Sequence, residues 1–214
     1  MKIAIFGGTF DPIHNAHLIV AKEAADRFQL ARVQFIPAGN PPFKQAFTSL
    51  EHRYRMVELA CSEDRRFVAS RLEQGDKKSY SIDTIERVKA EGGDVSFIIG
   101  ADAFAEIRTW HRADDVIRSV DFIVVTRPGH AYEVPPGARV HRLDAVALGS
   151  SSSSIRQELA RGKTPADLPP RVVEYIRKNG LYRSLTAEWW SGLSLATVLQ
   201  GRLSDIPLLR RNTG

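Results

Sequence analysis

Cysteine is nearly absent from this chain, and long apolar runs are missing altogether. Cys61 is the only cysteine in 214 residues, which excludes an intrachain disulfide and a cysteine-rich zinc site. Its place beside Ala60 in a helical pattern predicts a small packed residue. No stretch approaches the length of a membrane span, and no basic segment followed by an apolar core marks a secretory signal. We therefore expect a cytoplasmic protein without membrane partners.

Large charge imbalance and blocks of like charge are also absent. The net charge of +5 and the pI near 9.5 indicate a mild preference for anionic partners. Nucleotides satisfy that preference, and no aromatic-studded basic surface predicts a nucleic-acid partner. The hydrophobic content of 43% is ordinary for a globular protein, and the length allows one domain with a full core.

Apolar runs alternate with helical patterns along the chain. The runs that predict strands are Lys2 to Phe6, Arg32 to Pro37, Phe67 to Leu72, Val95 to Ile99, Asp121 to Thr126 and Arg139 to Leu143. Between them, Thr48 with Glu51 fits a capping box, and Ser81 is expected to cap a further helix. This alternation predicts an α/β fold, with a mostly parallel sheet covered by helices on both faces.

The first strand leads into the most informative segment of the sequence. Gly7 and Gly8 are expected to turn the chain sharply, and Thr9 lies in the same turn. His14 and His17 then open an amphipathic helix. Ligands of α/β proteins bind at such strand-to-helix turns, and a helix N-terminus offers free N–H groups and partial positive charge. The segment therefore predicts a phosphate site.

A run of serines at positions 150–154 forms the second notable segment. By composition it is also typical of a flexible linker. However, the pattern from Ile155 to Ala160 is helical, so a serine is expected at its N-cap. The hydroxyls of Ser152 and Ser153 and the Arg156 guanidinium would then join the free N–H groups in a second anion site.

These two segments resemble the signatures of the nucleotidyltransferase superfamily. Gly8–His17 resembles the (T/H)xGH signature, although Ala16 stands where the family usually has glycine. Ser151–Arg156 resembles the ISSTxxR motif, with Ser150 at the isoleucine position. Five further blocks look like the bacterial nicotinate mononucleotide adenylyltransferases: Asn40–Lys44, Tyr80–Thr84, Ile98–Asp102, Trp110–Arg112 and Arg127–Gly129.

The resemblance runs from Met1 to about Arg183. It implies a Rossmann-like nucleotidyltransferase domain over residues 1–183, followed by a C-terminal tail of unknown role over 184–214. Within the domain, Leu181 and Tyr182 are expected to dock as a final anchor after a helix that stops near Asn179.

The chemistry that the resemblance implies is adenylyl transfer. The phosphate of nicotinate mononucleotide would attack the α-phosphorus of ATP, giving deamido-NAD and pyrophosphate. A phosphate monoester is already an anionic nucleophile, so the site needs alignment and charge compensation more than a strong base. Mg²⁺ is expected to arrive mainly on the ATP phosphates, with no metal site made by the protein alone.

The resemblance also implies residue roles. His14 and His17 would contact ATP phosphates, with His17 stabilising the transition state, and Arg156 would grip the β and γ groups. The other residues expected to bind ATP are Gly7, Gly8, Thr9, Lys44, Asp102, Ser152 and Ser153, and those expected to bind nicotinate mononucleotide are Asn40, Thr84 and Trp110. For Trp110, stacking on the pyridine ring and simple core packing both stay open. For Lys44, which follows a predicted strand end, a phosphate ligand and a solvated surface charge are equal alternatives.

Two rival interpretations remain. The first is a catalytically silent nucleotide-binding or regulatory protein on the same fold, favoured only by Ala16, Ser150 and the tail. The second is another adenylyl or cytidylyl transferase, although those relatives usually lack the block from Gly100 to Trp110. Assembly into a homo-oligomer is left open by the sequence.

Overall fold

The computed structural model describes residues 1–40, 46–75, 78, 80–126, 129, 131–145 and 151–183. Residues Met1–Tyr182 form one compact unit. The second unit begins at Arg183, which is the only one of its residues described. The predicted tail therefore lies outside the described residues, and its boundary and role stay predictions.

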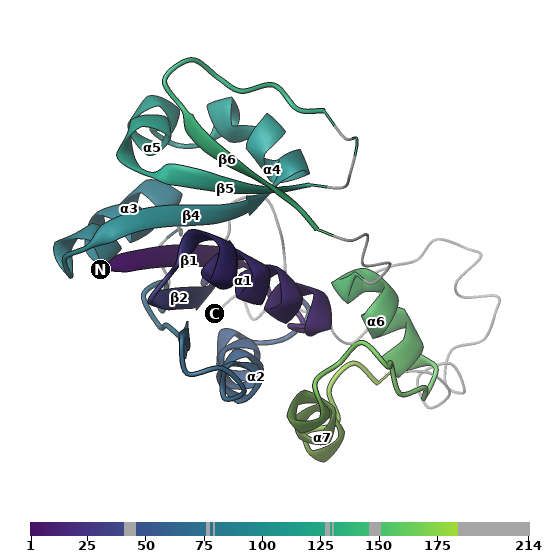
Figure 1. The fold of residues 1–214 in the computed structure, drawn as a ribbon. Helices are drawn as coiled ribbons and strands as arrows, with labels where there is room; N and C mark the ends of the chain where they lie inside the picture. The colour runs from purple at the N-terminus through teal and green to yellow at the C-terminus, as the bar shows by residue number, and fades with distance from the viewer. Residues whose placement is uncertain are drawn as a thin grey trace, which may run out of the picture. The chain divides into compact units, whose positions relative to one another are not determined.

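The described strands form one parallel sheet in the order β3-β2-β1-β4-β5-β6 (Figure 1). Their bounds are β1 Lys2–Gly8, β2 Arg32–Pro37, β3 Phe67–Ala69, β4 Asp94–Gly100, β5 Asp121–Thr126 and β6 Arg139–Asp144. β2 and β3 are added in turn on one side of β1, and β4, β5 and β6 are then added in turn on its other side. The strand order thus reverses between β1 and β4, which is where α/β sheets form their ligand crevice.

Helices cover both faces of the sheet, which confirms the predicted α/β fold. One face carries α1 Asn15–Phe28, α2 Leu50–Cys61, α6 Ser152–Ala160 and α7 Pro170–Lys178, and the other carries α3 Ser81–Ala90, α4 Ala101–Ala105, the 3-10 turn Ile107–Thr109 and α5 Ala113–Ser119. Alternating residues of β1 serve the two faces: Ala4 faces the first, and Ile3 and Ile5 face the second. This alternation is what a strand buried on both sides requires.

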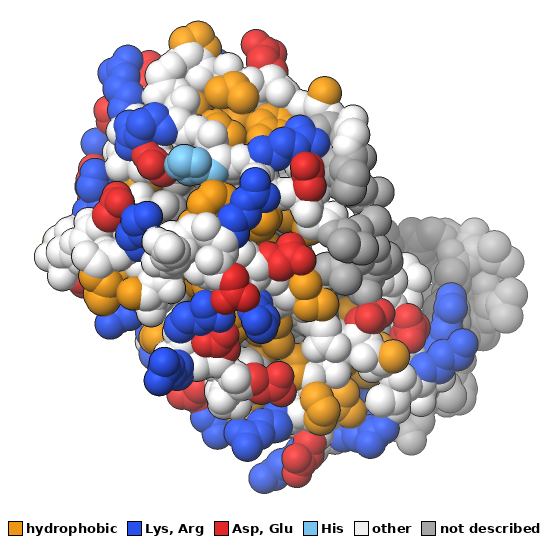
Figure 2. Space-filling view, in the orientation of Figure 1, with side chains coloured by type: hydrophobic (Ala, Val, Ile, Leu, Met, Phe, Trp, Pro, Cys, Tyr) orange, Lys and Arg blue, Asp and Glu red, His pale blue; other side chains and the backbone are white. Residues whose placement is uncertain are grey.

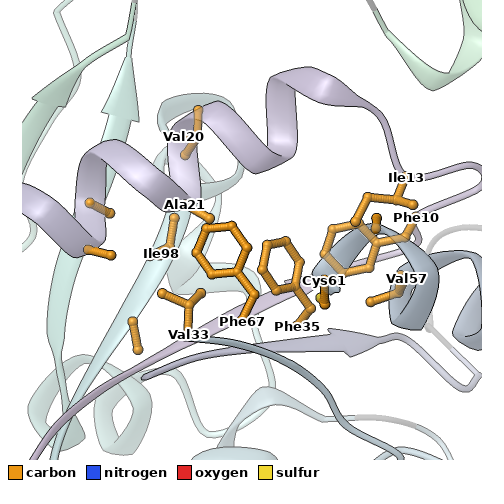
Figure 3. Packing of buried hydrophobic residues seen from close by; sticks show 14 of the residues in the cluster. Phe10, Ile13, Val20, Ala21, Val33, Phe35, Val57, Cys61, Phe67 and Ile98 are labelled. Carbon is orange, nitrogen blue, oxygen red and sulfur yellow. The ribbon is translucent and has the colours of Figure 1, made fainter. Parts of the chain in front are cut away.

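The core beneath α1 is built around aromatic rings (Figure 3). Phe35 is fully buried, with its ring centroid 5.3 Å from that of Phe67 and 5.8 Å from that of Phe10. Cys61 packs into the same cluster, and its burial raises the pKa of the thiol to about 12. The predicted small packed role of Cys61 is confirmed. Because Phe10 belongs both to this core and to the turn after β1, the core fixes the position of that turn.

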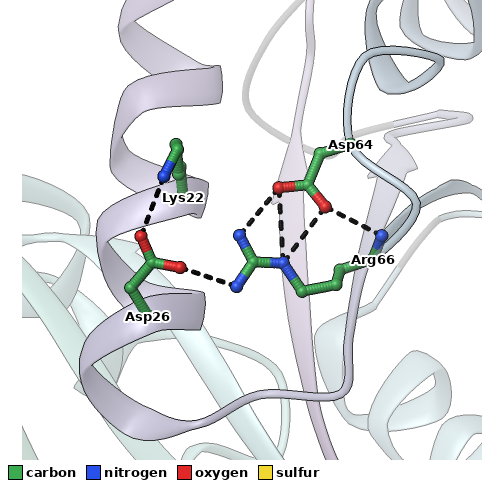
Figure 4. Close-up of polar contacts among 4 residues, drawn as sticks. All are labelled: Lys22, Asp26, Asp64 and Arg66. Carbon is green, nitrogen blue, oxygen red and sulfur yellow. Dashed lines mark hydrogen bonds and ion pairs between the residues drawn. The ribbon is translucent and has the colours of Figure 1, made fainter.

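A surface network fastens α1 to the segment before β3 (Figure 4). The Arg66 guanidinium contacts Asp26 on α1 and Asp64, each at 2.7 Å, and Lys22 contacts Asp26 at 2.9 Å. The exposed Lys22–Asp26 pair contributes little stability, whereas the Arg66–Asp64 pair is partly buried. Acidic and basic side chains are interspersed on the face shown in Figure 2, and no single-sign patch dominates it.

The start of α2 differs from the prediction. Ser49 is the N-cap, and its hydroxyl accepts a hydrogen bond from the backbone N–H of His52 at 3.3 Å. The capping box predicted for Thr48 and Glu51 is therefore wrong. Thr48 instead donates its hydroxyl to the Asp11 carboxylate at 2.7 Å, a contact across the fold that sequence spacing does not reveal.

Candidate active site

The turn after β1 is not made by the glycine pair. Gly7 and Gly8 continue the strand and pair with β2 along their length, so the predicted sharp turn at the glycines is wrong. The chain turns at Phe10, which has a left-handed backbone (φ 49°), and at the cis Asp11–Pro12 bond. Gly8 is needed for space, because a Cβ there would lie only 3.0 Å from the Phe10 ring. Thr9 stands half-buried in this turn.

The two histidines lie together where α1 begins. His14 is the N-cap and His17 is in the first turn, with their ring centroids 3.9 Å apart. The backbone N–H of His14 donates to Nδ1 of His17 at 3.2 Å. Since this Nδ1 accepts, the proton of a neutral His17 ring is on Nε2. His17 therefore presents Nε2–H as its hydrogen-bond donor.

Both imidazoles are neutral near pH 7 in the ligand-free protein. Burial lowers the pKa of His14 to about 4, against a smaller opposing effect of Asp167. Burial also holds the pKa of His17 well below its ordinary value, and neighbouring His14 lowers it further. The Nδ1 atom of His14 is buried without a hydrogen-bond partner among the described residues. A bound phosphate would favour the protonated form of the His14 ring and raise its pKa, whereas His17 accepts at Nδ1 only as a neutral ring.

The depressed pKa of His14 predicts that the ligand-free protein loses stability in mild acid. The unfolded His14 takes up a proton near pH 6.5, but the folded residue does so only near pH 4. Between these values the unfolded state binds more protons, so stability is full above about pH 6.5 and falls as the pH is lowered. The loss due to His14 is about 3 kcal/mol once the pH passes its folded pKa.

Urea unfolding of the wild type and of His14→Asn across this pH range measures the effect. Carboxylates contribute to acid unfolding in both proteins, so the difference between the two slopes isolates His14. The variant should show the shallower slope. Equal slopes would show that His14 is not held in its neutral form by the fold.

The helix after the serine run begins next to this turn. Ser151 is the N-cap of α6, and it forms a reciprocal capping box with Ser154, which confirms the predicted serine cap. The helix starts at Ser152, so Ser152 and Ser153 lie in its first turn and not before it. The first N–H groups of a helix have no partner within it and remain available to an anion.

Hydrogen bonds join the start of α6 to the turn after β1. The Ser152 hydroxyl donates to the carbonyl of Pro12 at 3.0 Å. The Arg156 guanidinium donates to the carbonyl of Asp11 at 2.7 Å and to the hydroxyl of Ser153 at 3.1 Å. The two anion sites predicted separately from sequence are therefore neighbours in the structure.

The Asp11 side chain organises this region, although sequence reasoning assigned it no role. It is only 2% exposed. Its carboxylate accepts hydrogen bonds from the Phe47 backbone N–H at 2.5 Å, the Thr48 hydroxyl at 2.7 Å and the Tyr182 hydroxyl at 2.6 Å. The Tyr182 contact confirms the predicted anchor at the end of the domain. Arg53, also 2% exposed, donates to the carbonyl of Thr9 at 2.8 Å and supports the same turn.

We predict that Asp11→Asn costs the protein about 1–3 kcal/mol of unfolding free energy, because an amide nitrogen would face donors where the carboxylate oxygens now accept. Asp26→Asn is the matched control, because Asp26 forms only exposed ion pairs and should change stability by about 0.5 kcal/mol or less. Urea unfolding of both variants gives the comparison. Equal effects would contradict the organising role of Asp11.

Two of the blocks that resemble the adenylyltransferases, at the start of α3 and after the 3-10 turn, also lie close together. The Tyr80 and His111 rings stack with centroids 4.3 Å apart, which brings the start of α3 against the segment after the 3-10 turn. Trp110 contacts Phe97 edge to face at 6.2 Å and lines an open groove of about 440 Å³. Trp110 therefore packs against the core and also faces an open groove, so the structure is compatible with both interpretations, core packing and stacking on the pyridine ring.

Thr84 is less open to a ligand than expected. It is buried in the first turn of α3, and its hydroxyl donates to the Glu73 carboxylate at 2.8 Å. The N-cap of α3 is Tyr80, without a side-chain hydrogen bond, so the cap predicted at Ser81 is wrong. The extended backbone of Tyr80 brings Ser81 itself into the helix.

Three predicted site residues have less structural support. Asp102 is exposed in the first turn of α4, directly after β4. Asn40 is exposed after β2. Lys44 lies outside the described residues, as does Ser150. The structure therefore brings together His14, His17, Ser152, Ser153 and Arg156, while Lys44 stays a sequence-based candidate.

The described parts of the chain contain no group of three or more His, Cys, Asp or Glu side chains placed to hold a metal ion. Within these same parts, no helix has the length and apolar character that crossing a membrane requires.

Comparison with known proteins identifies the class first. The cytidylyltransferase-like family model matches residues 5–158, the span that contains both anion sites. Together with the parallel sheet and its reversal of strand order between β1 and β4, this match makes the chain a nucleotidyltransferase of the cytidylyltransferase-like class.

The particular family follows from the relatives. A protein of Solibacter usitatus named "Probable nicotinate-nucleotide adenylyltransferase" is 56% identical over 85% of this chain and all of its own length. A Thermus thermophilus protein of the same name is 40% identical over 86% of this chain and all of its own length. The Plasmodium falciparum nicotinic acid mononucleotide adenylyltransferase complexed with NaAD shares the fold, with a TM-score of 0.72 at 20% identity, covering 85% of this chain and 97% of that one. This chain belongs to the nicotinate-nucleotide adenylyltransferase family.

Proposed function

We propose that this chain transfers AMP from ATP to nicotinate mononucleotide, forming deamido-NAD and releasing pyrophosphate. The observation that carries the proposal is the meeting of two anion sites, the start of α1 with His14 and His17 and the start of α6 with Arg156, on the Asp11–Pro12 turn. The identity of the substrates is inferred from the names of its relatives.

The site suits an in-line transfer without a general base. An oxygen of the mononucleotide phosphate attacks the α-phosphorus of ATP, and the bond from that phosphorus to the β-phosphate oxygen breaks. The attacking phosphate is already an anion, so the protein's main task is to align two polyanions and to stabilise charge on the leaving pyrophosphate.

Each part of the site has a place in this scheme. His17 donates Nε2–H to a phosphate oxygen, with its ring oriented by the His14 backbone N–H. The Arg156 guanidinium and the first turn of α6, with Ser152 and Ser153, hold the β and γ phosphates, and Lys44 adds a further cation. Because His14 is neutral before ATP binds, we expect ATP binding to be accompanied by proton uptake at the His14 ring near neutral pH.

Mg²⁺ fits this site as a partner of ATP and not as a resident metal. The described residues include no cluster of side chains able to cage an ion, and Mg²⁺ commonly binds through substrate phosphates and water. When bound, it neutralises part of the phosphate charge. Asp102, exposed after β4, would contact a nucleotide hydroxyl.

We place the nicotinate ring against Trp110, with Asn40 as a further contact. Thr84 contacts this ligand only if its hydrogen bond to Glu73 is released. Trp110→Ala should raise KM for nicotinate mononucleotide about tenfold, since a stacked aromatic face contributes about 1–1.5 kcal/mol, while KM for ATP changes little. Steady-state kinetics with each substrate varied in turn checks this. Trp110→Phe is the control that keeps a ring. A rise in both KM values, with a lower melting temperature, would instead indicate that Trp110 serves only the core.

The proposed function is tested by incubating the protein with ATP, Mg²⁺ and either nicotinate or nicotinamide mononucleotide. Pyrophosphate and dinucleotide should form together, faster with the nicotinate form. ATP binding without either product would favour the silent nucleotide-binding interpretation, which no observation in the structure supports. The expected cytoplasmic location, the absence of nucleic-acid and membrane partners, and the oligomeric state stay predictions.

A further inference from the structure

Phe47 is an exposed aromatic residue for which the fold offers no packing role. Its side chain is 75% exposed, the highest value among the large hydrophobic residues of the described chain, and it belongs to neither core cluster. Burial cannot explain it, because an exposed ring gains little from the hydrophobic effect. Its position beside the candidate phosphate site suggests a local interaction.

The ring of Phe47 lies against the Arg156 guanidinium, whose central carbon is 4.2 Å from the ring centroid. This distance is within the range of a cation–π interaction. The guanidinium also donates along its edge to the Asp11 carbonyl and the Ser153 hydroxyl. Among the described residues, Arg156 is held on one face by the Phe47 ring and at its edge by two acceptors, and no hydrogen bond from its other N–H groups is found there.

The position of Phe47 is itself fixed by the turn after β1. Its backbone N–H donates to the Asp11 carboxylate at 2.5 Å, and the next residue, Thr48, binds the same carboxylate through its hydroxyl. Asp11 therefore uses its side chain to hold Phe47 and its carbonyl to hold Arg156. One residue sets the separation of the ring and the guanidinium.

We propose that Phe47 is a positioning residue for Arg156: its ring holds the guanidinium in the orientation that receives the ATP phosphates. The inference rests on the proposed role of Arg156. An arginine side chain has many rotamers, and restricting them before ATP arrives lowers the entropy cost of binding. Phe47 does not touch the phosphates, so its effect reaches ATP only through Arg156.

The test is a double-mutant cycle between Phe47→Leu and Arg156→Ala, with kcat/KM for ATP and the ATP dissociation constant from calorimetry as readouts. Phe47→Leu should lower kcat/KM and weaken ATP binding about two- to fivefold, as expected for an exposed cation–π contact. KM for nicotinate mononucleotide and the melting temperature should hardly change. Phe47→Tyr keeps the aromatic face and should recover most of the loss, and Val134→Ala controls for removing an exposed apolar side chain elsewhere.

In the Arg156→Ala background, Phe47→Leu should have no further effect. An equal loss in both backgrounds would overturn the inference, because Phe47 would then act independently of Arg156. A large loss from Arg156→Ala with none from Phe47→Leu would also overturn it while leaving the proposed function intact. If the wild type gave no turnover, the proposed function would fail, and the binding cycle alone would still decide the role of Phe47.

Discussion

Replacement of Arg156 by alanine is expected to lower kcat/KM for ATP by about 10²–10³-fold. Rates usually fall by this factor when an enzyme loses one preorganised hydrogen-bond donor that faces the charge developing in the transition state. Arg156 stands in the first turns of α6 and reaches the Asp11 carbonyl at 2.7 Å. Its charge is thereby placed where the sheet reverses strand order and where the leaving pyrophosphate would lie. Arg156→Lys should recover only part of the loss, because an ammonium lacks the planar fork of the guanidinium.

Loss of folding must be separated from loss of function in this variant. Arg156 is half-buried and contributes two hydrogen bonds, so Arg156→Ala should unfold in one cooperative transition within a few degrees of the wild type. Arg161→Ala, at the other end of α6, is the matched control and should keep wild-type kinetics. Wild-type kcat/KM in a folded Arg156→Ala protein would refute the role of Arg156 in holding phosphate.

Replacement of His17 by alanine should lower kcat by about 10²–10³-fold with a smaller change in KM for ATP. The His17 ring is oriented by the backbone N–H of His14, which accounts for a single donor at Nε2. A group fixed before the substrate arrives acts most strongly where charge develops, which is in the transition state.

The separate changes in kcat and in KM distinguish two roles for His17. A normal kcat with a raised KM would reduce it to a residue that binds ground-state ATP. His141→Ala removes an exposed histidine on β6 and controls for the loss of an imidazole elsewhere. Proton uptake on ATP binding, measured by calorimetry in two buffers, should persist in His17→Ala, because the His14 ring takes up the proton.

Much of the fold was predictable from short-range patterns. Arg32–Pro37 and Asp121–Thr126 have the predicted bounds, because strands buried on both faces give continuous apolar runs. The edge strand β3 ends at Ala69 and not at Leu72. An edge strand has one neighbour, so its apolar pattern specifies its end less closely.

The parts of the site that are built by residues close together in the sequence were predictable. The parts that are built by residues far apart in the sequence were not. The serine cap of α6 follows from its own sequence, whereas Asp11 acquires its role from Phe47, Thr48 and Tyr182. Nothing in the spacing of these residues along the chain indicates that they meet. Similarly, the glycine pair suggested a turn, although the fold uses Gly8 to admit the Phe10 ring.

The most direct test of the central claim is the stoichiometry of products from ATP and nicotinate mononucleotide in the presence of Mg²⁺. The two neighbouring anion sites predict that each molecule of deamido-NAD appears with one of pyrophosphate, and that both products are strongly reduced in Arg156→Ala and His17→Ala. Formation of ADP or free AMP in place of the dinucleotide, or product formation that neither substitution affects, would contradict the account.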